Sequence, residues 1–322
     1  MNRLISGLIK FGNKLKKTVE ELNPDLVYVH GNDTLTGIRF LRQGQSFALV
    51  TDSHMLRMAS INRFSKCFQS FYRFYVTPKI IKQNIPVIRT QNDDYVQSCL
   101  GIPLSQAPWI SYGTDTALFY PDATIKKKFR QENRIPEENF VFVYTGKLDE
   151  AKGGKLLAQA FLKRFSLCKD VTLIVVGSLH GEYGESVGRL FEQSENQIIQ
   201  FPTQKYHDLG KFYQAADACV FAKQCSLSFY DAQGCALPVL SEDNNINIDR
   251  NSHNNGWTFK SGDIVDFRRI IEQIVNMPDE EFRNYSNNAY NFIIENYDYE
   301  AKAREYEKIL LDTYRRFMER KK

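Results

Sequence analysis

The sequence predicts an α/β protein whose strands form parallel sheets. Short apolar runs, of which Phe140–Tyr144 is typical, alternate along the chain with segments of helical periodicity. This alternation is the pattern of strands joined by crossover helices. The chain has 322 residues, 43% of them hydrophobic and 25% charged, which is sufficient for two globular domains with separate cores. No apolar run approaches the roughly eighteen residues of a membrane-spanning helix.

The elements follow in a regular order. In the first part of the chain we expect helices near residues 3–22, 33–43 and 91–100, and strands near 25–30, 46–51 and 86–90. In the second part we expect strands near 140–145, 171–177, 197–201, 218–222 and 238–240, separated by helices. Residues from about 263 onward have helical periodicity only, and the last predicted helix runs from about Tyr299 to Arg320.

Positive charge is concentrated in the first part of the chain. Residues 1–120 carry 14 lysines and arginines against 8 acids, hence +6, and the rest carries 28 against 30, hence −2. Within residues 56–90 there is no acid, and seven cations are interleaved with six aromatic residues. Such a segment can dock on an anionic membrane surface, or it can form a core helix whose aromatic side chains face inward. No nucleic-acid-binding module accompanies it, so nucleic acid is not an expected partner.

Cysteines and histidines give no sign of a metal site. The six cysteines lack Cys-x-x-Cys spacing, so we expect reduced thiols in a cytoplasmic protein. The five histidines show no metal-ligand spacing, so no bound metal is expected.

Two runs carry the candidate chemistry. The run from Tyr144 to Gly154 follows a strand and places Lys147 and Lys152 among glycines before a helix, which is an anion-binding arrangement. About seventy-five residues later, Asp231 lies on a short predicted helix that leads through a small-residue turn into a strand. Together the runs suggest a site for a nucleotide diphosphate, with cations for the phosphates and an acid for the ribose hydroxyls. Solvated surface lysines are the alternative interpretation of the first run.

These runs resemble the signature of family 4 retaining glycosyltransferases of the GT-B fold, of the bacterial polysaccharide-biosynthesis type. The matching strings, in order, are Gly113–Asp115, Phe119–Pro121, Gly146–Lys147, Lys152–Gly153, Asp231–Ala232 and Ala236–Val239. The resemblance implies two Rossmann-like domains. Residues 1–120 would form an acceptor-side domain, 121–295 a nucleotide-sugar-binding domain, and 296–322 a helix that packs back across the interdomain face.

The resemblance also implies an activity. The chain would transfer a hexose, with retention and without a metal, from a nucleotide-diphosphate sugar to a polysaccharide or lipid-linked oligosaccharide in capsule, O-antigen or lipopolysaccharide synthesis. The nucleotide sugar would be a substrate, and no cofactor is expected. Such an enzyme would be cytoplasmic, or peripheral on the inner face of the plasma membrane through residues 56–90.

Site residues follow from the matched positions. Lys147 and Lys152 would neutralise the diphosphate, Asp231 would hold the ribose, and His54 would contact the sugar or acceptor. Further donor-binding positions are Gly146, Gly153, Gly177, Pro202, Thr203, Ser226 and Ser228. Structural roles as strand-end turns or helix caps are the alternatives for several of these positions.

Two departures from the family pattern stand out. Lys223 occupies the place of the first acid of the family's acidic pair, which puts the usual contact to the donor sugar in doubt. The first domain also lacks the counterparts of three early strands, so that its sheet would expose an edge that a partner chain could complete. Both departures favour the alternative of a non-catalytic, nucleotide-binding partner subunit of a glycosyltransferase complex.

Overall fold

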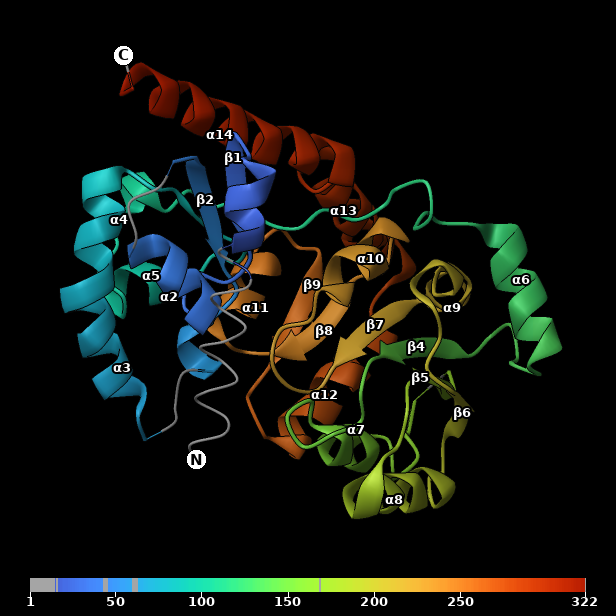
Figure 1. The fold of residues 1–322 in the computed structure, drawn as a ribbon. Coiled ribbons are helices and arrows are strands. Elements are labelled where there is room, and N and C mark those ends of the chain that lie inside the picture. The colour runs from blue at the N-terminus through green and yellow to red at the C-terminus, as the bar shows by residue number, and fades with distance from the viewer. Residues whose placement is uncertain (1–14, 16, 43–45, 60–62, 168, 322) are drawn as a thin grey trace. The chain divides into compact units, whose positions relative to one another are not determined.

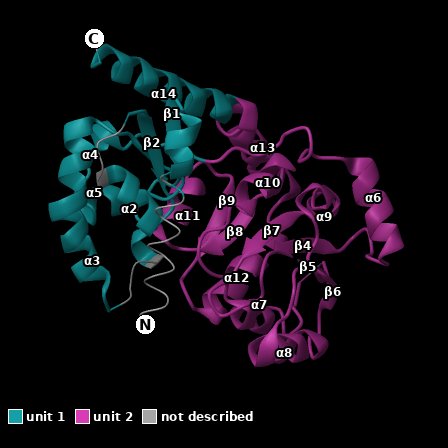
Figure 2. Ribbon diagram, viewed as in Figure 1, with its two compact units in different colours: residues 1–111, 301–322 teal, residues 112–300 magenta. Residues whose placement is uncertain are grey.

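The computed structural model describes residues 15, 17–42, 46–59, 63–167 and 169–321. It comprises two compact units: unit 1 is Met1–Ser111 with Ala301–Lys322, and unit 2 is Tyr112–Glu300 (Figure 2). Both units contain a parallel sheet with helices (Figure 1), as the sequence predicts. The expected domain limits at residues 120 and 295 stay predictions, and each unit is described by itself.

Unit 1 is built on three parallel strands in the order β1-β2-β3. The strands are β1 (Leu26–Val29), β2 (Ala48–Ser53) and β3 (Val87–Arg89). The helical elements are α2 (Leu35–Arg42), η1 (Arg57–Ala59), α3 (Ser65–Phe71), the π-helix η2 (Tyr72–Val76), α4 (Thr77–Gln83), α5 (Tyr95–Ser98) and η3 (Leu104–Gln106). Most of helix α14 (Tyr299–Glu319) also belongs to unit 1. Of the helix expected over 3–22, only residues 15 and 17–22 are described, and these are helical.

Both faces of the unit 1 sheet are covered. Because successive side chains of a strand point to opposite faces, Leu49 packs into the cluster that includes Ile80 of α4. Its neighbour Val50 packs on the other face with Ile309 and Leu310 of α14. This two-sided burial explains why β2 is an almost continuous apolar run up to Val50.

Unit 2 has a six-stranded parallel sheet in the order β6-β5-β4-β7-β8-β9. The strands are β4 (Phe140–Thr145), β5 (Val171–Val176), β6 (Gln197–Phe201), β7 (Ala218–Phe221), β8 (Val239–Glu242) and β9 (Gly256–Phe259). The helical elements are α6 (Ala123–Glu132), α7 (Gly154–Ala160), α8 (Gly181–Glu192), η4 (Tyr206–Asp208), α9 (Gly210–Ala215), α10 (Ser228–Gly234), α11 (Asn245–Arg250), α12 (Ile264–Val275) and α13 (Asp279–Asn296).

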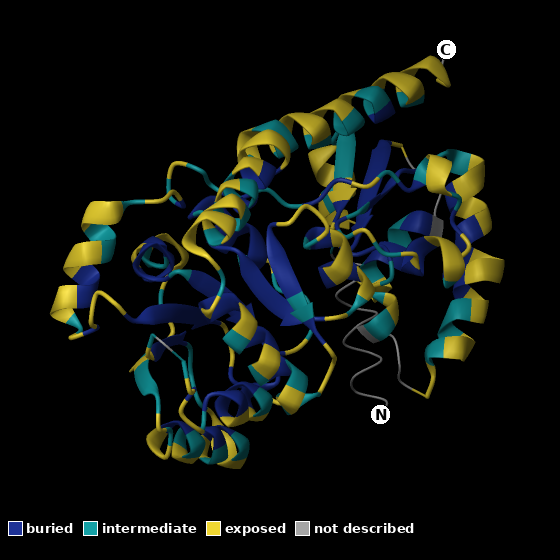
Figure 3. Ribbon diagram, turned by 180° about the vertical axis from the view of Figure 1, so that it is seen from behind, coloured by how far each residue is buried: buried dark blue, intermediate teal, exposed yellow. Residues whose placement is uncertain are grey.

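The central strands of unit 2 lie in its core. Every residue of β4, β5 and β7 is buried, and the strands appear dark blue in Figure 3. The chain proceeds from β4 outward to β5 and β6, and then returns to the other side of β4 as β7. The order therefore reverses between β4 and β7, which makes the carboxyl ends of these two strands the topological switch point of the sheet.

Two features of the fold were not expected. Strand β9 was not predicted, because a four-residue strand flanked by polar residues gives little periodicity to recognise. A π-helical turn, η2, interrupts the α-helical path between α3 and α4. Within the described residues, no helix combines the length and the apolar character needed to cross a membrane.

Candidate functional site

The loops after β4 and β7 lie side by side at the switch point of unit 2. The two strands are paired in parallel, so their carboxyl ends meet at the same edge of the sheet. The Nζ atom of Lys152, from the β4 loop, donates to the backbone oxygen of Cys225 at 3.4 Å. In return, Nζ of Lys223 lies 3.5 Å from the backbone oxygen of Glu150. The structure thus brings the lysine-bearing run into contact with the β7 loop that precedes Asp231 in the chain.

The β4 loop has a backbone that glycine permits. Gly146 and Gly153 have positive φ angles of 145° and 72°, which side chains disfavour. A Cβ atom on Gly153 would lie 2.9 Å from the Cβ atom of Lys223, so this glycine also allows the two loops to approach. The hydroxyl of Tyr144 donates to the backbone oxygen of Lys147 at 2.6 Å and so ties the loop to the end of β4. Lys147 is exposed.

Gly177 allows the ends of three strands to close together. Its own N–H donates to the backbone oxygen of Phe201 at 3.0 Å, and the Gly146 N–H donates to that of Val176 at 3.0 Å. A Cβ atom on Gly177 would lie 1.9 Å from the Gly146 oxygen, far inside van der Waals contact. Any larger residue here would push the β4 loop away. Gly177 is thus required for the shape of the site, whether or not it touches a ligand.

The other predicted donor-binding residues flank the same edge of the sheet. Pro202 and Thr203 follow β6 and are exposed. Ser226 and Ser228 are half-buried at the start of α10, where the Ser226 Oγ atom accepts from the Ser228 N–H at 3.3 Å. A side-chain hydrogen bond also links Ser228 to Tyr213. Both serines therefore have local structural partners.

Asp231 is held inside unit 2. The residue is only 6% exposed. Its Oδ1 atom accepts hydrogen bonds from the Thr114 hydroxyl and, at 3.1 Å, from the Tyr206 hydroxyl. Burial raises the pKa of Asp231 to about 6, although these two hydrogen bonds act in the opposite direction. The carboxyl group therefore changes charge close to neutral pH.

The string Gly113–Asp115, read in the sequence as part of the family signature, has a local structural basis. A Cβ atom on Gly113 would lie 2.4 Å from the Cα atom of Tyr299. Thr114 exchanges backbone hydrogen bonds with Tyr297 and Tyr299, and its hydroxyl reaches Asp231. This string anchors the carboxylate on which the proposed ribose site depends.

Three side chains that the sequence analysis did not single out fix the β7 loop. Glu242 accepts from the N–H of Gln224, whose φ is +61°, and Asn247 donates to the Gln224 oxygen at 3.2 Å. Arg250 donates to the backbone oxygen of Ser226 at 2.7 Å. In the sequence these residues could have been found only by their position at a strand end. Glu242 ends β8, the strand beside β7, and Asn247 and Arg250 lie on the helix that follows it, α11.

In unit 1, His54 belongs to a compact polar cluster at the carboxyl end of the sheet. The Asp52 Oδ2 atom lies 3.0 Å from His54 Nε2 and 3.0 Å from His30 Nδ1. Asp52 also accepts from the Tyr28 hydroxyl at 2.5 Å and from the Gly31 N–H at 2.6 Å. Burial alone would raise the pKa of Asp52, but the hydrogen bonds from His54, Tyr28 and Gly31 outweigh it and lower the pKa to about 2.

The basic aromatic segment divides its aromatic side chains between the core and the surface. Tyr72 is fully buried, and Phe68 packs against the same core cluster. By contrast, the exposed aromatic residues are Phe64 (62%), Phe71 (37%), Phe74 (75%) and Tyr75 (61%). Within this segment, residues 60–62 lie outside the described part of the chain. The core interpretation thus holds for Tyr72 and Phe68, and docking on an anionic membrane surface stays a prediction.

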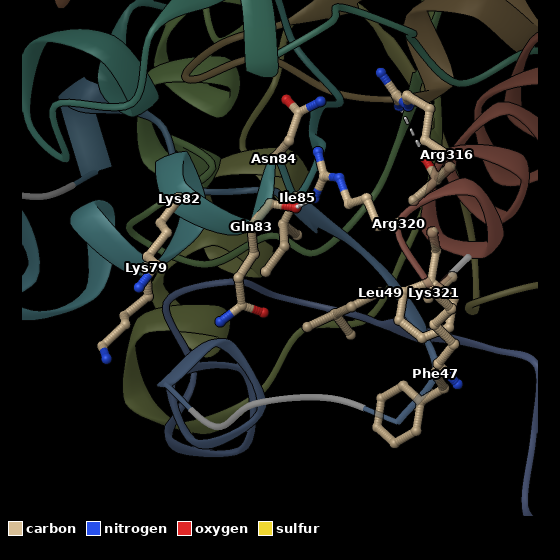
Figure 4. Close-up of a pocket in the computed structure, with 13 residues that line it drawn as sticks. Phe47, Leu49, Lys79, Lys82, Gln83, Asn84, Ile85, Arg316, Arg320 and Lys321 are labelled. Carbon is tan, nitrogen blue, oxygen red and sulfur yellow. Dashed lines mark hydrogen bonds between the residues drawn. The ribbon is translucent and has the colours of Figure 1, made fainter.

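A pocket of about 510 Å³ lies at the amino end of β2, within unit 1. Its lining has an apolar floor that includes Phe47 and Leu49, and five cations: Lys79, Lys82, Arg316, Arg320 and Lys321. Figure 4 shows that these cations do not converge on one point, because Arg320 is directed at Gln83 and Lys79 lies far from Arg316. Arg320 indeed donates to the Gln83 oxygen at 2.7 Å. The five cations therefore do not form one compact anion site.

Comparison with known proteins identifies the family. The model of the family described as glycosyl transferases group 1 matches residues 125–292, which is more than half of the chain and includes both loops at the switch point. The chain belongs to this family. It is accordingly a glycosyltransferase, and the β4 and β7 loops lie within the residues that match the family. A search of curated proteins found no match.

Solved structures share the fold of this group 1 glycosyltransferase. HepE from Anabaena in complex with UDP is 19% identical, with a TM-score of 0.76 over 94% of this chain and 82% of that one. Sucrose-phosphate synthase from Thermosynechococcus elongatus is 18% identical, with a TM-score of 0.75 over 99% and 80%. WaaG, a glycosyltransferase involved in lipopolysaccharide biosynthesis, is 16% identical, with a TM-score of 0.67 over 92% and 80%. These likenesses confirm the predicted GT-B fold with two Rossmann-like domains.

Proposed function

We propose that this glycosyltransferase is of the family 4 retaining type and moves a hexose from a nucleotide-diphosphate sugar to a polysaccharide or lipid-linked oligosaccharide. One observation carries the proposal: the glycine-rich loop that carries Lys147 and Lys152 contacts the β7 loop, through Lys152, at the switch point of unit 2. Ligands of open α/β sheets bind at such points. The likeness to HepE, a protein solved in complex with UDP, supports a nucleotide as the ligand.

In this proposal the residues divide the donor between them. Lys147 and Lys152 neutralise the diphosphate, together with backbone N–H groups that Gly146 and Gly153 leave accessible. Asp231 holds the ribose hydroxyls, and its bonds from Thr114 and Tyr206 orient the carboxyl group. The base lies against Gly177, Pro202 and Thr203, Ser226 and Ser228 border the diphosphate and sugar, and His54 of unit 1 contacts the sugar or acceptor.

The proposed reaction needs no metal and no protein nucleophile. The acceptor hydroxyl attacks the anomeric carbon from the side of the leaving group, so the configuration is retained. The new carbon–oxygen bond forms as the bond to the diphosphate breaks, and the hydroxyl proton passes to the departing phosphate oxygen. Charge that develops on the diphosphate is stabilised by the two preorganised ammonium groups.

Lys152→Ala tests the diphosphate site. With labelled nucleotide hexoses and a lipid-linked glycan fraction as acceptor, in EDTA, the variant should lose about a hundredfold or more in transfer, as for other charge-stabilising donors. Lys155→Ala is the matched control, because Lys155 is an exposed lysine three residues away whose ammonium lies over the Tyr183 ring at 5.0 Å. Equal transfer by both variants would contradict the assignment. The anomeric configuration of the product tests retention.

A non-catalytic, nucleotide-binding partner subunit is the second candidate, and Lys223 favours it. The residue is exposed and its ammonium is directed at the β4 loop, where the family's first acid would contact the donor sugar. If the purified chain binds UDP or GDP in calorimetry but transfers no sugar until a second protein from the same cell is added, the partner-subunit function is correct. Transfer by the purified chain alone excludes it.

We further propose that the acceptor is presented at a membrane, in synthesis of surface polysaccharide. Phe74 and Tyr75 are exposed, and the acid-free segment that carries them supplies Lys79 and Lys82 to the cationic pocket. Vesicles of anionic phosphatidylglycerol should bind the protein and neutral phosphatidylcholine vesicles should not. Phe74→Ala should weaken that binding, whereas Tyr120→Ala, at an exposed aromatic residue of unit 2, should leave it unchanged. Identical binding of both variants would contradict the proposed surface.

A further inference from the structure

The polar cluster of unit 1 has the geometry of a metal site. The atoms Asp52 Oδ2, His30 Nδ1 and His54 Nε2 form a nearly equilateral triangle with sides of 3.0, 3.0 and 3.1 Å. Two ligand atoms at right angles, each about 2.1 Å from a metal ion, are about 3.0 Å apart. The triangle therefore matches one face of an octahedron. Among the described residues, these three form the one group of His, Cys, Asp and Glu side chains placed closely enough to hold an ion.

Hydrogen bonds alone do not account for this triangle. A hydrogen bond from either histidine to the Asp52 carboxylate requires an N–H on the ring nitrogen that faces it. If both histidines direct N–H groups at Asp52, two donors face each other across the 3.1 Å side between His30 and His54. If either histidine carries its proton on the other ring nitrogen, the lone pair of an unprotonated nitrogen faces the carboxylate. A cation at the triangle instead accepts a lone pair from all three atoms.

The surroundings hold the three side chains in this arrangement. The Gly31 N–H and the Tyr28 hydroxyl fix the Asp52 carboxylate. The His54 Nδ1 atom lies 3.2 Å from the Thr90 Oγ1 atom, and a proton on Nδ1 leaves the Nε2 lone pair directed at the triangle. Partners of this kind orient the ligands of natural metal sites.

Access and charge also suit a cation. The His30 side chain is 74% exposed whereas that of Asp52 is 3% exposed, so the site is open on one side and a hydrated ion can enter. The carboxyl group of Asp33 is near enough to interact electrostatically with Asp52 and His54. A second acid beside the triangle favours positive charge there.

We propose that His30, Asp52 and His54 bind one divalent first-row transition-metal ion, such as Zn²⁺ or Co²⁺, on the unit 1 sheet edge. Two imidazoles with one carboxylate select such ions over Mg²⁺ and Ca²⁺, which prefer oxygen ligands. The remaining coordination positions are filled by water or by a ligand that enters from the exposed side. All three ligands belong to unit 1, and the inference depends neither on the proposed transfer reaction nor on the contact to sugar or acceptor proposed for His54.

Calorimetric titration of the full chain tests the site without measuring turnover. After EDTA treatment and dialysis, ZnCl₂ and CoCl₂ should each bind at one ion per chain, and MgCl₂ should bind at least about a hundredfold more weakly. His30→Ala should lower the affinity at least tenfold, and Tyr28→Phe, which keeps all three ligands, should lower it about ten- to a hundredfold. His207→Ala is the control, because His207 is an exposed histidine with one carboxylate, Asp208, at 3.6 Å.

Visible absorption of bound Co²⁺ gives a second readout, since it reports the ligand field and should change in His30→Ala. An exposed thiol such as Cys67 could bind zinc in all variants equally, so the difference between His30→Ala and wild type is the quantity that counts. His30→Asn replaces His30→Ala if the alanine variant does not fold. Absence of Zn²⁺ and Co²⁺ binding by the wild type, or equal affinities of the wild type and the His30 variants, would overturn the proposal.

Discussion

Asp231→Asn should change how the stability of unit 2 depends on pH. Asparagine has nearly the same shape as aspartate, and its side-chain oxygen can accept the hydrogen bonds that Thr114 and Tyr206 donate. The substitution therefore removes the ionisation of residue 231 with little change in packing. The comparison isolates one titration, because every other group titrates in both proteins.

The magnitude follows from the raised pKa. The carboxyl group has a pKa of about 6 in the folded protein against 3.8 for an ordinary aspartate, and one pKa unit corresponds to about 1.4 kcal/mol. The free energy of unfolding of the wild type, relative to the variant, should thus fall by about 3 kcal/mol as the pH rises from below 4 to above 6. The free energy of unfolding falls, and does not rise, with pH because in this range the folded state holds a proton on Asp231 that the unfolded state has lost. Above pH 7 the difference should be constant.

Urea unfolding at pH values from 4 to 8, followed by tryptophan fluorescence, measures this difference. Trp257 lies in unit 2, is 8% exposed and stacks on Tyr285 at 4.5 Å, so it reports the unfolding of that unit. Trp109 lies in unit 1, and Trp109→Phe in both proteins removes its signal. Asp208→Asn controls for the loss of one carboxylate charge from unit 2. A difference between wild type and Asp231→Asn that does not vary with pH would refute the burial argument.

Three further substitutions test the packing described above. Gly177→Ala should displace the β4 loop, because the new Cβ would lie 1.9 Å from the Gly146 oxygen; binding of UDP in calorimetry should be lost, and unchanged binding would contradict the close approach. Arg130→Ala should lower the unfolding free energy of unit 2 by about 1.5–3 kcal/mol in urea, since it removes the guanidinium that lies 2.8 Å from the partly buried carboxylate of Asp217 and leaves the ammonium of Lys126 as its ionic partner. Leu310→Ala should destabilise unit 1 by about 1–3 kcal/mol, because it removes contacts of α14 with the sheet; a thermal unfolding midpoint equal to that of the wild type would show that α14 contributes little.

The fold was largely predictable because its strands are strongly apolar. Each of the six residues of β4 is buried, and a run of this kind has few other interpretations. The segment 256–259 has Thr258 and Gly256 among its four residues and was missed, because its pairing with β8 is decided by tertiary contact. Propensity and pattern do not reveal such an edge strand.

The site was predictable where a spacing in the sequence carries the chemistry. Lys147 and Lys152 share one loop, so their proximity follows from the sequence alone. The cluster in unit 1 depends instead on strand register: Val29 is paired with Thr51, which sets His30 beside Asp52. The sequence alone does not reveal that register, and the two histidines, which follow neighbouring strands, do not have metal-ligand spacing along the chain.

The division of the chain has a consequence for its biosynthesis. Unit 1 takes residues from both ends of the polypeptide, since Ile309 and Leu310 cover the sheet face that contains Val50. During translation, residues 112–300 leave the ribosome before Ile309 and Leu310 do. Unit 2 can therefore form its core before unit 1 is complete. Until α14 is synthesised, the face of β2 that carries Val50 is exposed to solvent. Chaperones that bind apolar strands would bind there.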